Sequence, residues 1–200
     1  MKGKDGRTSN DGKADESDQA GRGLRLSTRR VYSGRVISVD VDTVRFPNGT
    51  VGELEIVRHS GASAVVPFVS DASGMDPQIL LLKQYRYAAE GYLYEVPAGR
   101  LDPGEEPLAC AQRELKEETG CVAERVTLMT TIYTTPGFTD ERIHLFMAEG
   151  LTMGQAAPEA DELIEVETMP LSQALSLIED GTIKDAKTAL ALLFAAGFRC

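Results

Sequence analysis

Three glutamates lie close together in one short stretch of the sequence, RELKEETG, at residues 113–120. If this stretch is helical, Glu114 shares a face with both Glu117 and Glu118, because residues three and four apart are neighbours on a helix. Like charges at that spacing destabilise a helix by roughly a few tenths of a kcal/mol. Solvent or the basic residues of the same stretch could offset this repulsion. The chemically specific alternative is a divalent cation, which needs several carboxylate oxygens from one rigid element.

The helix that would carry these glutamates is predicted to begin near Pro107 and to end at Gly120. Proline is favoured in the first helical turn, and glycine is a common C-terminal cap. The inner face of this helix is expected to consist of Leu108, Ala111 and Leu115.

Other segments of the chain alternate with a period of two, which is typical of strands. A hairpin is predicted from residues 36–46 and 51–59, joined by the turn Pro-Asn-Gly. Further strands are predicted at residues 63–69, 78–87, 92–98, 127–133, 142–150 and 163–169, and helices at 171–180 and 185–196. Because strands and helices do not alternate regularly, we expect an α+β fold or αβα sandwich and not a doubly wound sheet.

The length and charge of the chain limit the classes of protein it can be. At 200 residues and 42% hydrophobic, the chain can form one ordinary domain and a small module. Residues 1–23 are polar and lack periodicity, so we interpret them as a disordered leader. The net charge is −10, and residues 31–200 alone carry −13, so this body should repel nucleic acid.

Membrane insertion and the common thiolate sites are also disfavoured. The longest apolar run, at residues 189–198, is too short to cross a bilayer, and the N-terminus resembles no signal peptide. We therefore expect no membrane partner and a cytoplasmic location. Cys110, Cys121 and Cys200 are odd in number and show no CxxC spacing, which disfavours disulfides and a zinc site. Cys110 and Cys121 are expected to be small core residues.

The spacing of the acidic stretch resembles the signature of the Nudix hydrolases, G-x5-E-x7-R-E-U-x-E-E-x-G-U. The match begins at Gly99 and Glu105 and continues through Arg113 and the glutamates to Gly120. Only the final aliphatic position differs, where Cys121 stands. This resemblance implies a Nudix αβα sandwich with a mixed sheet over residues 61–200. It also implies an antiparallel β module at 24–60 that serves dimerisation or substrate binding.

Segments that flank the signature resemble the ADP-ribose pyrophosphatase branch of this family. They are QYRY before the signature, EVPAG leading into it, and TTPGFTDE after it. Pro136, sixteen residues beyond Gly120, is similar to a proline that marks this branch, although Pro136-Gly137 is also an ordinary turn sequence.

The resemblance implies a metal site on the predicted helix. Glu114 and Glu118 would bind Mg²⁺ directly, Glu117 would bind directly or through water, and the carbonyl of Ala98 would complete the set. Mn²⁺ is a possible substitute. Mg²⁺ prefers oxygen ligands and retains several waters, so a few carboxylates together with substrate phosphates suffice.

The same resemblance gives Arg113 an orienting role through an ion pair with Glu105, with a surface ion pair as the plain alternative. Glu105, Arg113 and Glu117 are accordingly counted among the catalytic residues. The general base is expected in the acidic segment PEADELIEV, where Glu162 is the first choice and Glu159 and Asp161 are close rivals.

Four residues of the flanking segments are implied as substrate contacts: Arg58, Arg86, Glu95 and Glu141. Arg86 is the strongest of them, since a guanidinium can donate two hydrogen bonds to a phosphate. Tyr32 or Phe46 could stack on adenine. The related enzymes are dimers that exchange the N-terminal module, so a homodimer is expected.

Three functions remain open at this point. The leading hypothesis is Mg²⁺-dependent hydrolysis of ADP-ribose to AMP and ribose 5-phosphate. The second is hydrolysis of another nucleoside diphosphate sugar, such as GDP-mannose. The third is a catalytically silent Nudix module that only binds a nucleotide, which the intact glutamate cluster disfavours.

Overall fold

The computed structural model of the chain describes residues 23–157 and 163–197. The chain divides into two compact units, Met1–Val57 and Arg58–Cys200. The predicted leader, residues 1–23, lies outside the described residues except for Gly23.

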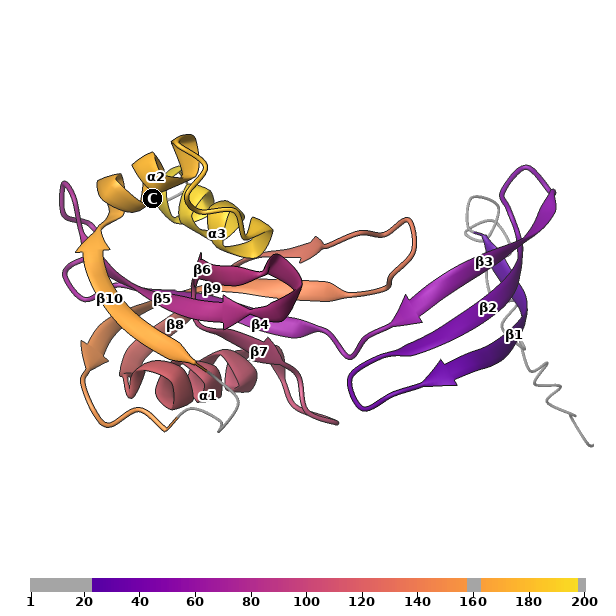
Figure 1. Cartoon of the computed structure of the whole chain (residues 1–200), viewed down its shortest axis with the longest axis horizontal. Coiled ribbons are helices and arrows are strands. Elements are labelled where there is room, and N and C mark those ends of the chain that lie inside the picture. Colours follow the sequence, from indigo (N-terminus) through magenta and orange to yellow (C-terminus); the bar gives the residue numbers. More distant parts are fainter. Residues whose placement is uncertain (1–22, 158–162, 198–200) are drawn as a thin grey trace, which may run out of the picture. The chain divides into compact units, whose positions relative to one another are not determined.

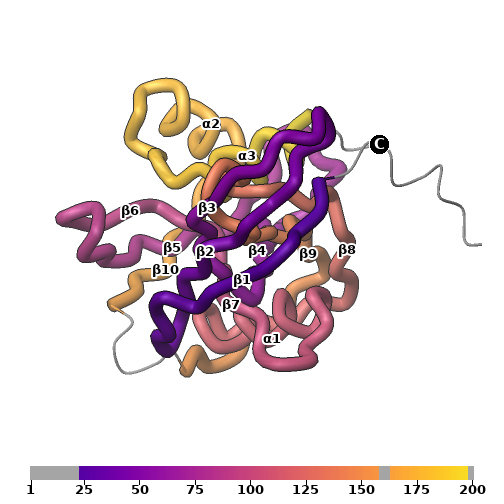
Figure 2. Tube along the Cα trace, turned by 90° about the vertical axis from the view of Figure 1, so that its right-hand side faces the viewer, coloured from indigo at the N-terminus to yellow at the C-terminus, as the bar shows by residue number. Residues whose placement is uncertain are grey.

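The first unit contains a three-stranded sheet in the order β1-β2-β3 (Figure 2). Its strands are β1 (Leu24–Ser33), β2 (Ser38–Arg45) and β3 (Val51–Arg58). The predicted hairpin corresponds to β2 and β3. Gly49 adopts a φ of +86° in the turn between them, which explains the need for glycine there.

The additional strand β1 was not predicted, because its residues show no apolar alternation and are exposed along its length. Polar contacts attach it to β2 instead. Arg30 forms an ion pair with Asp40. The hydroxyl of Thr28 donates a hydrogen bond of 2.5 Å to Asp42. Both aspartates are only 5% exposed, so they accept these contacts from β1 while largely shielded from water.

The second unit contains two sheets, which Figure 1 shows between helices. One sheet has the order β7-β4-β9-β8 and is mixed, because β4 and β9 are parallel while the other pairs are antiparallel. The other is antiparallel, in the order β10-β5-β6. The strands are β4 (Ala62–Pro67), β5 (Gln78–Arg86), β6 (Gly91–Glu95), β7 (Ala98–Arg100), β8 (Val122–Tyr133), β9 (Arg142–Thr152) and β10 (Ile164–Pro170).

Helices cover both sides of these sheets. α1 (Pro107–Thr119) lies on one side and α2 (Leu171–Glu179) and α3 (Ala186–Gly197) on the other (Figure 1). A short 3-10 helix, η2 (Tyr87–Ala89), joins β5 to β6. The core has two matching parts. One packs α1 against β4, β5 and β9, and the other packs α2 and α3 against β4, β5 and β9. The predicted αβα sandwich with a mixed sheet is therefore confirmed.

Two local predictions were wrong, and each has a physical reason. Residues 92–98 form two strands, because the chain changes sheets between β6 and β7 at Pro97, whose carbonyl accepts a hydrogen bond from Val65. In α1, Leu108 is 43% exposed, and the smaller Cys110 is fully buried instead. The helix packs closely on the sheet at this point, so the inner position is occupied by a small side chain.

No helix within residues 23–157 and 163–197 is long and apolar enough to cross a membrane.

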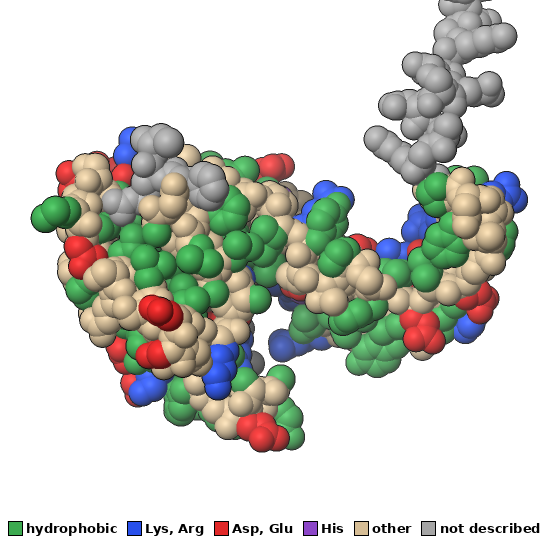
Figure 3. Space-filling model, turned by 90° about the horizontal axis from the view of Figure 1, so that it is seen from above, with side chains coloured by type: hydrophobic (Ala, Val, Ile, Leu, Met, Phe, Trp, Pro, Cys, Tyr) green, Lys and Arg blue, Asp and Glu red, His purple; other side chains and the backbone are tan. Residues whose placement is uncertain are grey.

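Figure 3 shows hydrophobic, acidic and basic side chains intermixed on the face of the second unit that α2 and α3 cover. Leu193 of α3 is one of the large hydrophobic side chains exposed in this unit.

Candidate active site

The two ends and the buried face of α1 fix the direction in which its glutamates point. Pro107 begins the helix, and Gly120 ends it with a φ of +74°, donating a hydrogen bond of 2.9 Å to the carbonyl of Lys116. Ala111 and Leu115 pack into the core with the fully buried Cys110 and Cys121. The adjacent part of this face carries Glu114 and Glu118 and lies against β7.

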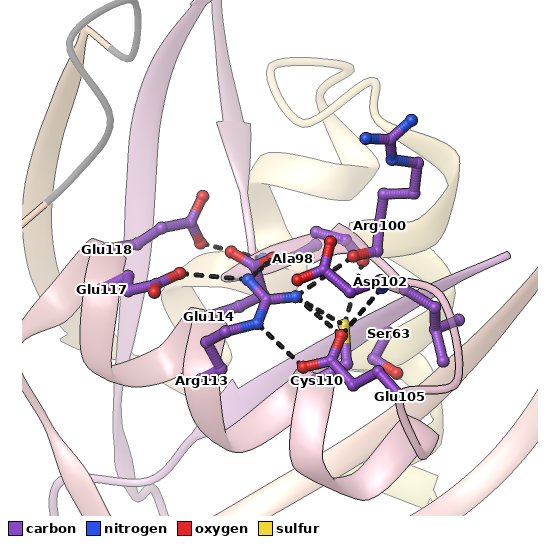
Figure 4. Close-up of polar contacts among 12 residues, drawn as sticks. Ser63, Ala98, Arg100, Asp102, Glu105, Cys110, Arg113, Glu114, Glu117 and Glu118 are labelled. Carbon is purple, nitrogen blue, oxygen red and sulfur yellow. Dashed lines mark hydrogen bonds and ion pairs between the residues drawn. The ribbon is translucent and has the colours of Figure 1, made fainter. Parts of the chain in front are cut away.

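Glu114 and Glu118 lie largely buried on this face, at 8% and 2% exposure. One carboxylate oxygen of Glu118 accepts a hydrogen bond of 2.9 Å from the backbone N–H of Ala98 (Figure 4). A Cβ at Gly99 would overlap the carboxylate of Glu114, so glycine is required for the close approach of β7 to this side chain. The first glycine of the sequence signature thus makes room for an acidic group.

Arg113 links the carboxylates of this group. Its Nε and Nη2 each donate a hydrogen bond of 2.9 Å to Glu105, in a bidentate pair. Its Nη1 donates to Glu114 at 2.6 Å and to Glu117 at 3.1 Å. Nη2 also donates to the carbonyl of Arg100 at 3.2 Å. The guanidinium therefore fixes three carboxylates relative to one another.

The ion pair with Arg113 changes the acidity of Glu105. The hydrogen bonds from Arg113 lower the pKa of Glu105 to about 2, with a smaller effect from the backbone N–H of Asp102. The pKa of Arg113 is raised, first by the hydrogen bond to Glu105 and then by the charge of Glu114. Burial raises the pKa of Cys110 to about 11, so its thiol stays protonated and is unsuited to act as a nucleophile.

Carboxylates outnumber cations in this group. Three glutamates pair with the guanidinium of Arg113, Glu118 lies beside them, and Figure 4 shows the side chain of Arg100 pointing away from this group. Lys116 is exposed and forms no ion pair within the described part of the chain. Within that part, no group of three or more acidic, histidine or cysteine side chains is arranged so that it could hold a metal ion.

The incomplete cage fits Mg²⁺ chemistry, because Mg²⁺ is usually held by one or two carboxylates with waters and substrate phosphates. Two buried carboxylates, a third that is 45% exposed at Glu117, and a neighbouring backbone carbonyl at Ala98 form a hard oxygen donor set. This donor set, with the close approach of Glu114 that Gly99 permits, is compatible with a divalent cation.

A second cluster of charges joins β5, β6 and α3. Nε and Nη2 of Arg86 donate to the two carboxylate oxygens of Glu95 at 2.7 and 2.8 Å. Nζ of Lys187 donates to Glu95 at 2.5 Å and to Asp185 at 3.1 Å. Glu95 is 2% exposed. The predicted substrate residues Arg86 and Glu95 are thus bound to each other.

Sequence reasoning missed Lys187 and Asp185. The predicted last helix began at Asp185, but α3 begins at Ala186, and the carboxylate of Asp185 caps it by accepting a hydrogen bond of 2.9 Å from the N–H of Thr188. No local signal linked Lys187 to Glu95, which lies 92 residues earlier in the chain.

Gln84, on the same strand as Arg86, has an unusual environment. It is 3% exposed, and its Oε1 atom has no hydrogen-bond partner within the described residues. A buried amide oxygen without a partner costs about 1–3 kcal/mol.

The other two predicted substrate residues lie where β3 meets β4 and in the loop between β8 and β9. Arg58 donates a hydrogen bond of 3.1 Å to Asp140. The carboxylate of Glu141 accepts a hydrogen bond of 2.9 Å from Thr134 and lies 3.3 Å from Nδ1 of His59. Arg58 and Glu141 are therefore held by this loop, whereas Arg86 and Glu95 are held by β5, β6 and α3.

The predicted general base, Glu162, and its rivals Glu159 and Asp161 lie outside the described residues. The residues on either side of this segment are described. The N–H of Ala157 donates a hydrogen bond of 2.8 Å to the carbonyl of Glu117, and the carbonyl of Leu163 accepts one of 3.2 Å from Tyr85.

Comparison with known proteins places this geometry in a family. The model of the NUDIX domain matches residues 59–192. The chain is 41% identical over 171 residues to an ADP-ribose pyrophosphatase of Bacillus subtilis (strain 168), covering 84% of this chain and 90% of that protein. With the same coverage, it is 39% identical to a methanol dehydrogenase activator of Bacillus methanolicus.

Another relative is a GDP-mannose pyrophosphatase of Cronobacter sakazakii (strain ATCC BAA-894), 39% identical over 123 residues, or 57% of this chain and 64% of that protein. A solved structure, the crystal structure of an ADP compounds hydrolase, matches the fold with a TM-score of 0.74. It covers 88% of this chain and 94% of its own, at 24% identity. The domain match and the extent of the similarity to the Bacillus proteins show that the chain belongs to the Nudix family.

Proposed function

We propose that the protein is a Mg²⁺-dependent hydrolase that cleaves the diphosphate linkage of ADP-ribose to AMP and ribose 5-phosphate. The observation that carries this proposal is the pair of buried carboxylates, Glu114 and Glu118, held against Ala98 and Gly99. The similarity over most of both chains to an ADP-ribose pyrophosphatase supports this choice of substrate.

Glu114, Glu117, Glu118 and the carbonyl of Ala98 would hold the Mg²⁺, for which Mn²⁺ could substitute. When bound, the ion would polarise a phosphoryl oxygen and lower the pKa of a water molecule. The protein's own contribution is to keep these oxygens close together. α1 supplies a rigid spacing, and Gly99 allows β7 to approach the Glu114 carboxylate.

Arg113 and Glu105 would orient these ligands. The bidentate pair with Glu105 fixes the guanidinium, which in turn donates to Glu114 and Glu117. Because the same Nη1 contacts both glutamates, Arg113 limits their repulsion before an ion binds.

Glu162 is the proposed general base, and Glu159 and Asp161 are the alternatives. The support comes from the residues on either side of this segment. Ala157 is hydrogen-bonded to Glu117 near the end of α1, and Leu163 is hydrogen-bonded to Tyr85, the residue before Arg86. We expect Glu162→Gln to lower kcat by about 10²- to 10⁴-fold with little change in KM. Near-normal turnover would mean that Glu159 or Asp161 is the general base. The variants Glu159→Gln and Asp161→Asn would then test these two residues.

Arg86 would bind the diphosphate. Its side chain is 42% exposed, and Nε and Nη2 are used by Glu95, which leaves Nη1 to donate to an incoming phosphate. Arg58, at the end of β3, and Glu141, in the loop between β8 and β9, remain proposed substrate contacts. Glu95, being buried and paired, would act by orienting Arg86.

The homodimer also remains a proposal. In it, the sheet β1-β2-β3 of residues 24–60 would be exchanged between subunits, and Tyr32 or Phe46 would stack on adenine. Tyr32 and Phe46 are 55% and 37% exposed, so both have aromatic surface available to a ligand. Light scattering that gave the mass of a monomer would contradict this proposal.

The experiment that tests the proposed function is release of a nucleoside monophosphate by the purified protein, AMP from ADP-ribose or NADH and GMP from GDP-mannose. The panel contains ADP-ribose, GDP-mannose, NADH and a nucleoside triphosphate, each with Mg²⁺ and with chelator. Release from ADP-ribose that chelator abolishes is the expected result. GDP-mannose is the second candidate, because a relative is a GDP-mannose pyrophosphatase, and hydrolysis of it without AMP release from ADP-ribose would replace the proposed substrate. Binding without turnover of any compound would indicate a silent module.

A further inference from the structure

The N-terminal turn of α3 reaches the strand end that leads to the candidate active site. Lys187, in this turn, donates to the carboxylate of Glu95, and the hydroxyl of Thr188 accepts a hydrogen bond of 2.9 Å from the N–H of Val96. Thr188 is fully buried. Two successive residues of β6 and its extension are thus held by two successive residues of α3.

Asp185 holds this turn in place. Its Oδ2 accepts hydrogen bonds from the N–H of Thr188 at 2.9 Å, from the hydroxyl of Thr188 at 2.6 Å and from Lys187 at 3.1 Å. The first of these contacts caps the helix, and the last fixes the ammonium group. The ammonium of Lys187 is therefore confined between two carboxylates, and its side chain is only 15% exposed.

Glu95 is the residue through which Lys187 could affect the substrate. Both of its oxygens accept from Arg86, and one also accepts from Lys187. Without Lys187, the buried carboxylate of Glu95 would keep Arg86 as its remaining partner, on the side that faces solvent. It could then turn toward solvent and take Arg86 with it, since a bidentate pair moves as one planar unit.

Arg86 is placed to use this support. Its side chain is 42% exposed, in contrast to 2% for Glu95 and 15% for Lys187. Nη1 of Arg86 has no hydrogen-bond partner within residues 23–157 and 163–197. The guanidinium is also near enough to Glu118 to interact with its charge. An ion pair that only stabilised the fold would need neither the exposed donor nor the proximity to the acidic site.

We propose that Lys187, fixed by Asp185, is a positioning residue that holds Glu95 and so aims the free edge of Arg86 at the diphosphate of the substrate. This proposal rests on the proposed function, because it names a further residue required for binding the same substrate. Lys187 contacts no substrate atom in this scheme. Its effect should therefore appear in substrate affinity and should require Arg86.

The main test compares Lys187→Met with Lys184→Met. Lys184 is exposed, lies three residues away, and carries the same charge, so it controls for the loss of a positive charge near the site. We expect Lys187→Met to raise KM for ADP-ribose by about 10- to 100-fold, as for other groups that orient a ligand-binding side chain, with kcat changed much less. Lys184→Met should leave both parameters unchanged. Lys187→Arg should restore most of the affinity.

A double-mutant cycle separates positioning from a general structural role. In an Arg86→Met background, Lys187→Met should raise KM no further, because its effect passes through Arg86. An equal additional increase in that background would overturn the proposal, and so would an unchanged KM in the single variant. If Lys187→Met does not fold, Asp185→Asn replaces it. Asparagine can still cap the helix but loses the charge that fixes Lys187, so a smaller rise in KM is expected.

Binding of α,β-methylene ADP-ribose, whose bridge blocks hydrolysis, distinguishes failure of this inference from failure of the proposed function. Isothermal titration calorimetry with Mg²⁺ should show the same loss of affinity in Lys187→Met. If the unaltered protein binds this analogue but releases no AMP from ADP-ribose, the proposed activity fails and the positioning role is still measured. No binding to the unaltered protein, or equal binding by both proteins, would overturn the inference.

Discussion

Two charged clusters in the second unit have opposite balances of charge. Around α1, Glu105, Glu114 and Glu117 share one guanidinium, that of Arg113, and Glu118 accepts a hydrogen bond from the backbone of Ala98. At the start of α3, two carboxylates are paired with two cations. Glu95 accepts from Arg86 and Lys187, and Asp185 accepts from Lys187. The charges of the balanced cluster neutralise one another, whereas the acidic one has carboxylates in excess. In the proposals above, the acidic cluster therefore holds a cation, and the balanced cluster holds Arg86 in position beside it.

The excess charge at α1 gives the largest expected effect. Glu118→Gln should lower AMP release by roughly 10²- to 10⁴-fold, because charge stabilisation by a bound metal is worth several kcal/mol. Glu106→Gln removes a charge from an exposed residue just before the same helix and serves as the control. Mg²⁺ should raise the melting temperature of the unaltered protein and not that of Glu118→Gln. Equal Mg²⁺ stabilisation of both would mean that the ion binds elsewhere.

The close approach of β7 to α1 gives the next effect. Gly99→Ala should lower kcat/KM by about 10- to 100-fold, since its Cβ would displace the carboxylate of Glu114. The φ of Gly99 is accessible to alanine, so the protein should still fold. Gly104→Ala is a contrasting variant, because Gly104 has open space around it but a φ of +79°, and it should lose stability and retain activity. Turnover of the two variants at saturating and at limiting substrate measures kcat and kcat/KM, and their melting temperatures measure stability.

At Thr188, beside the balanced cluster, the expected loss is one of stability. Thr188→Val keeps the shape of the side chain but leaves the buried N–H of Val96 without its acceptor, which should cost about 1–3 kcal/mol. Urea unfolding followed by circular dichroism would measure this. A loss of Mg²⁺ affinity with unchanged stability would contradict the division between the two clusters.

Acid should weaken the contact between Glu105 and Arg113. The pKa of Glu105 is lowered to about 2 from an ordinary value of 4.5, so this carboxylate binds fewer protons in the folded state. Its stabilising contribution is therefore fully present above about pH 4.5 and is lost as the pH falls toward 2. Because Arg113 is partly exposed, the contribution should be about 1 kcal/mol. The difference in unfolding free energy between the unaltered protein and Glu105→Gln should shrink across this range, and a constant difference would show that the pair is not coupled to pH.

The smallest expected effect concerns Gln84. If its unpartnered oxygen only costs stability, Gln84→Met should be neutral or stabilising by up to about 1 kcal/mol, since no hydrogen bond is lost. KM for ADP-ribose would then be unchanged. Calorimetric melting and KM together decide the matter, because a raised KM with unchanged stability would identify Gln84 as a substrate contact.

Much of the fold followed from local patterns, and the exceptions share a cause. The amphipathic segments and turn residues predicted most strands and all three α-helices among the described residues. β1 was not predicted, because polar pairs such as Thr28 and Asp42 connect it to β2, and such pairs produce no apolar alternation in the sequence. Leu108 was assigned to the wrong face because helical periodicity does not reveal how closely the sheet approaches.

The sequence by itself determined the family and the acidic face of α1, because the signature residues lie within 23 consecutive positions and helical spacing alone brings their glutamates together. Only the tertiary structure decided that Glu95 is a shared acceptor, that Lys187 and Asp185 belong beside it, and that Arg86 bonds Glu95 through Nε and Nη2. The physical reason is distance along the chain. An ion pair across 92 residues depends on how α3 packs against β6, and no local periodicity encodes that packing.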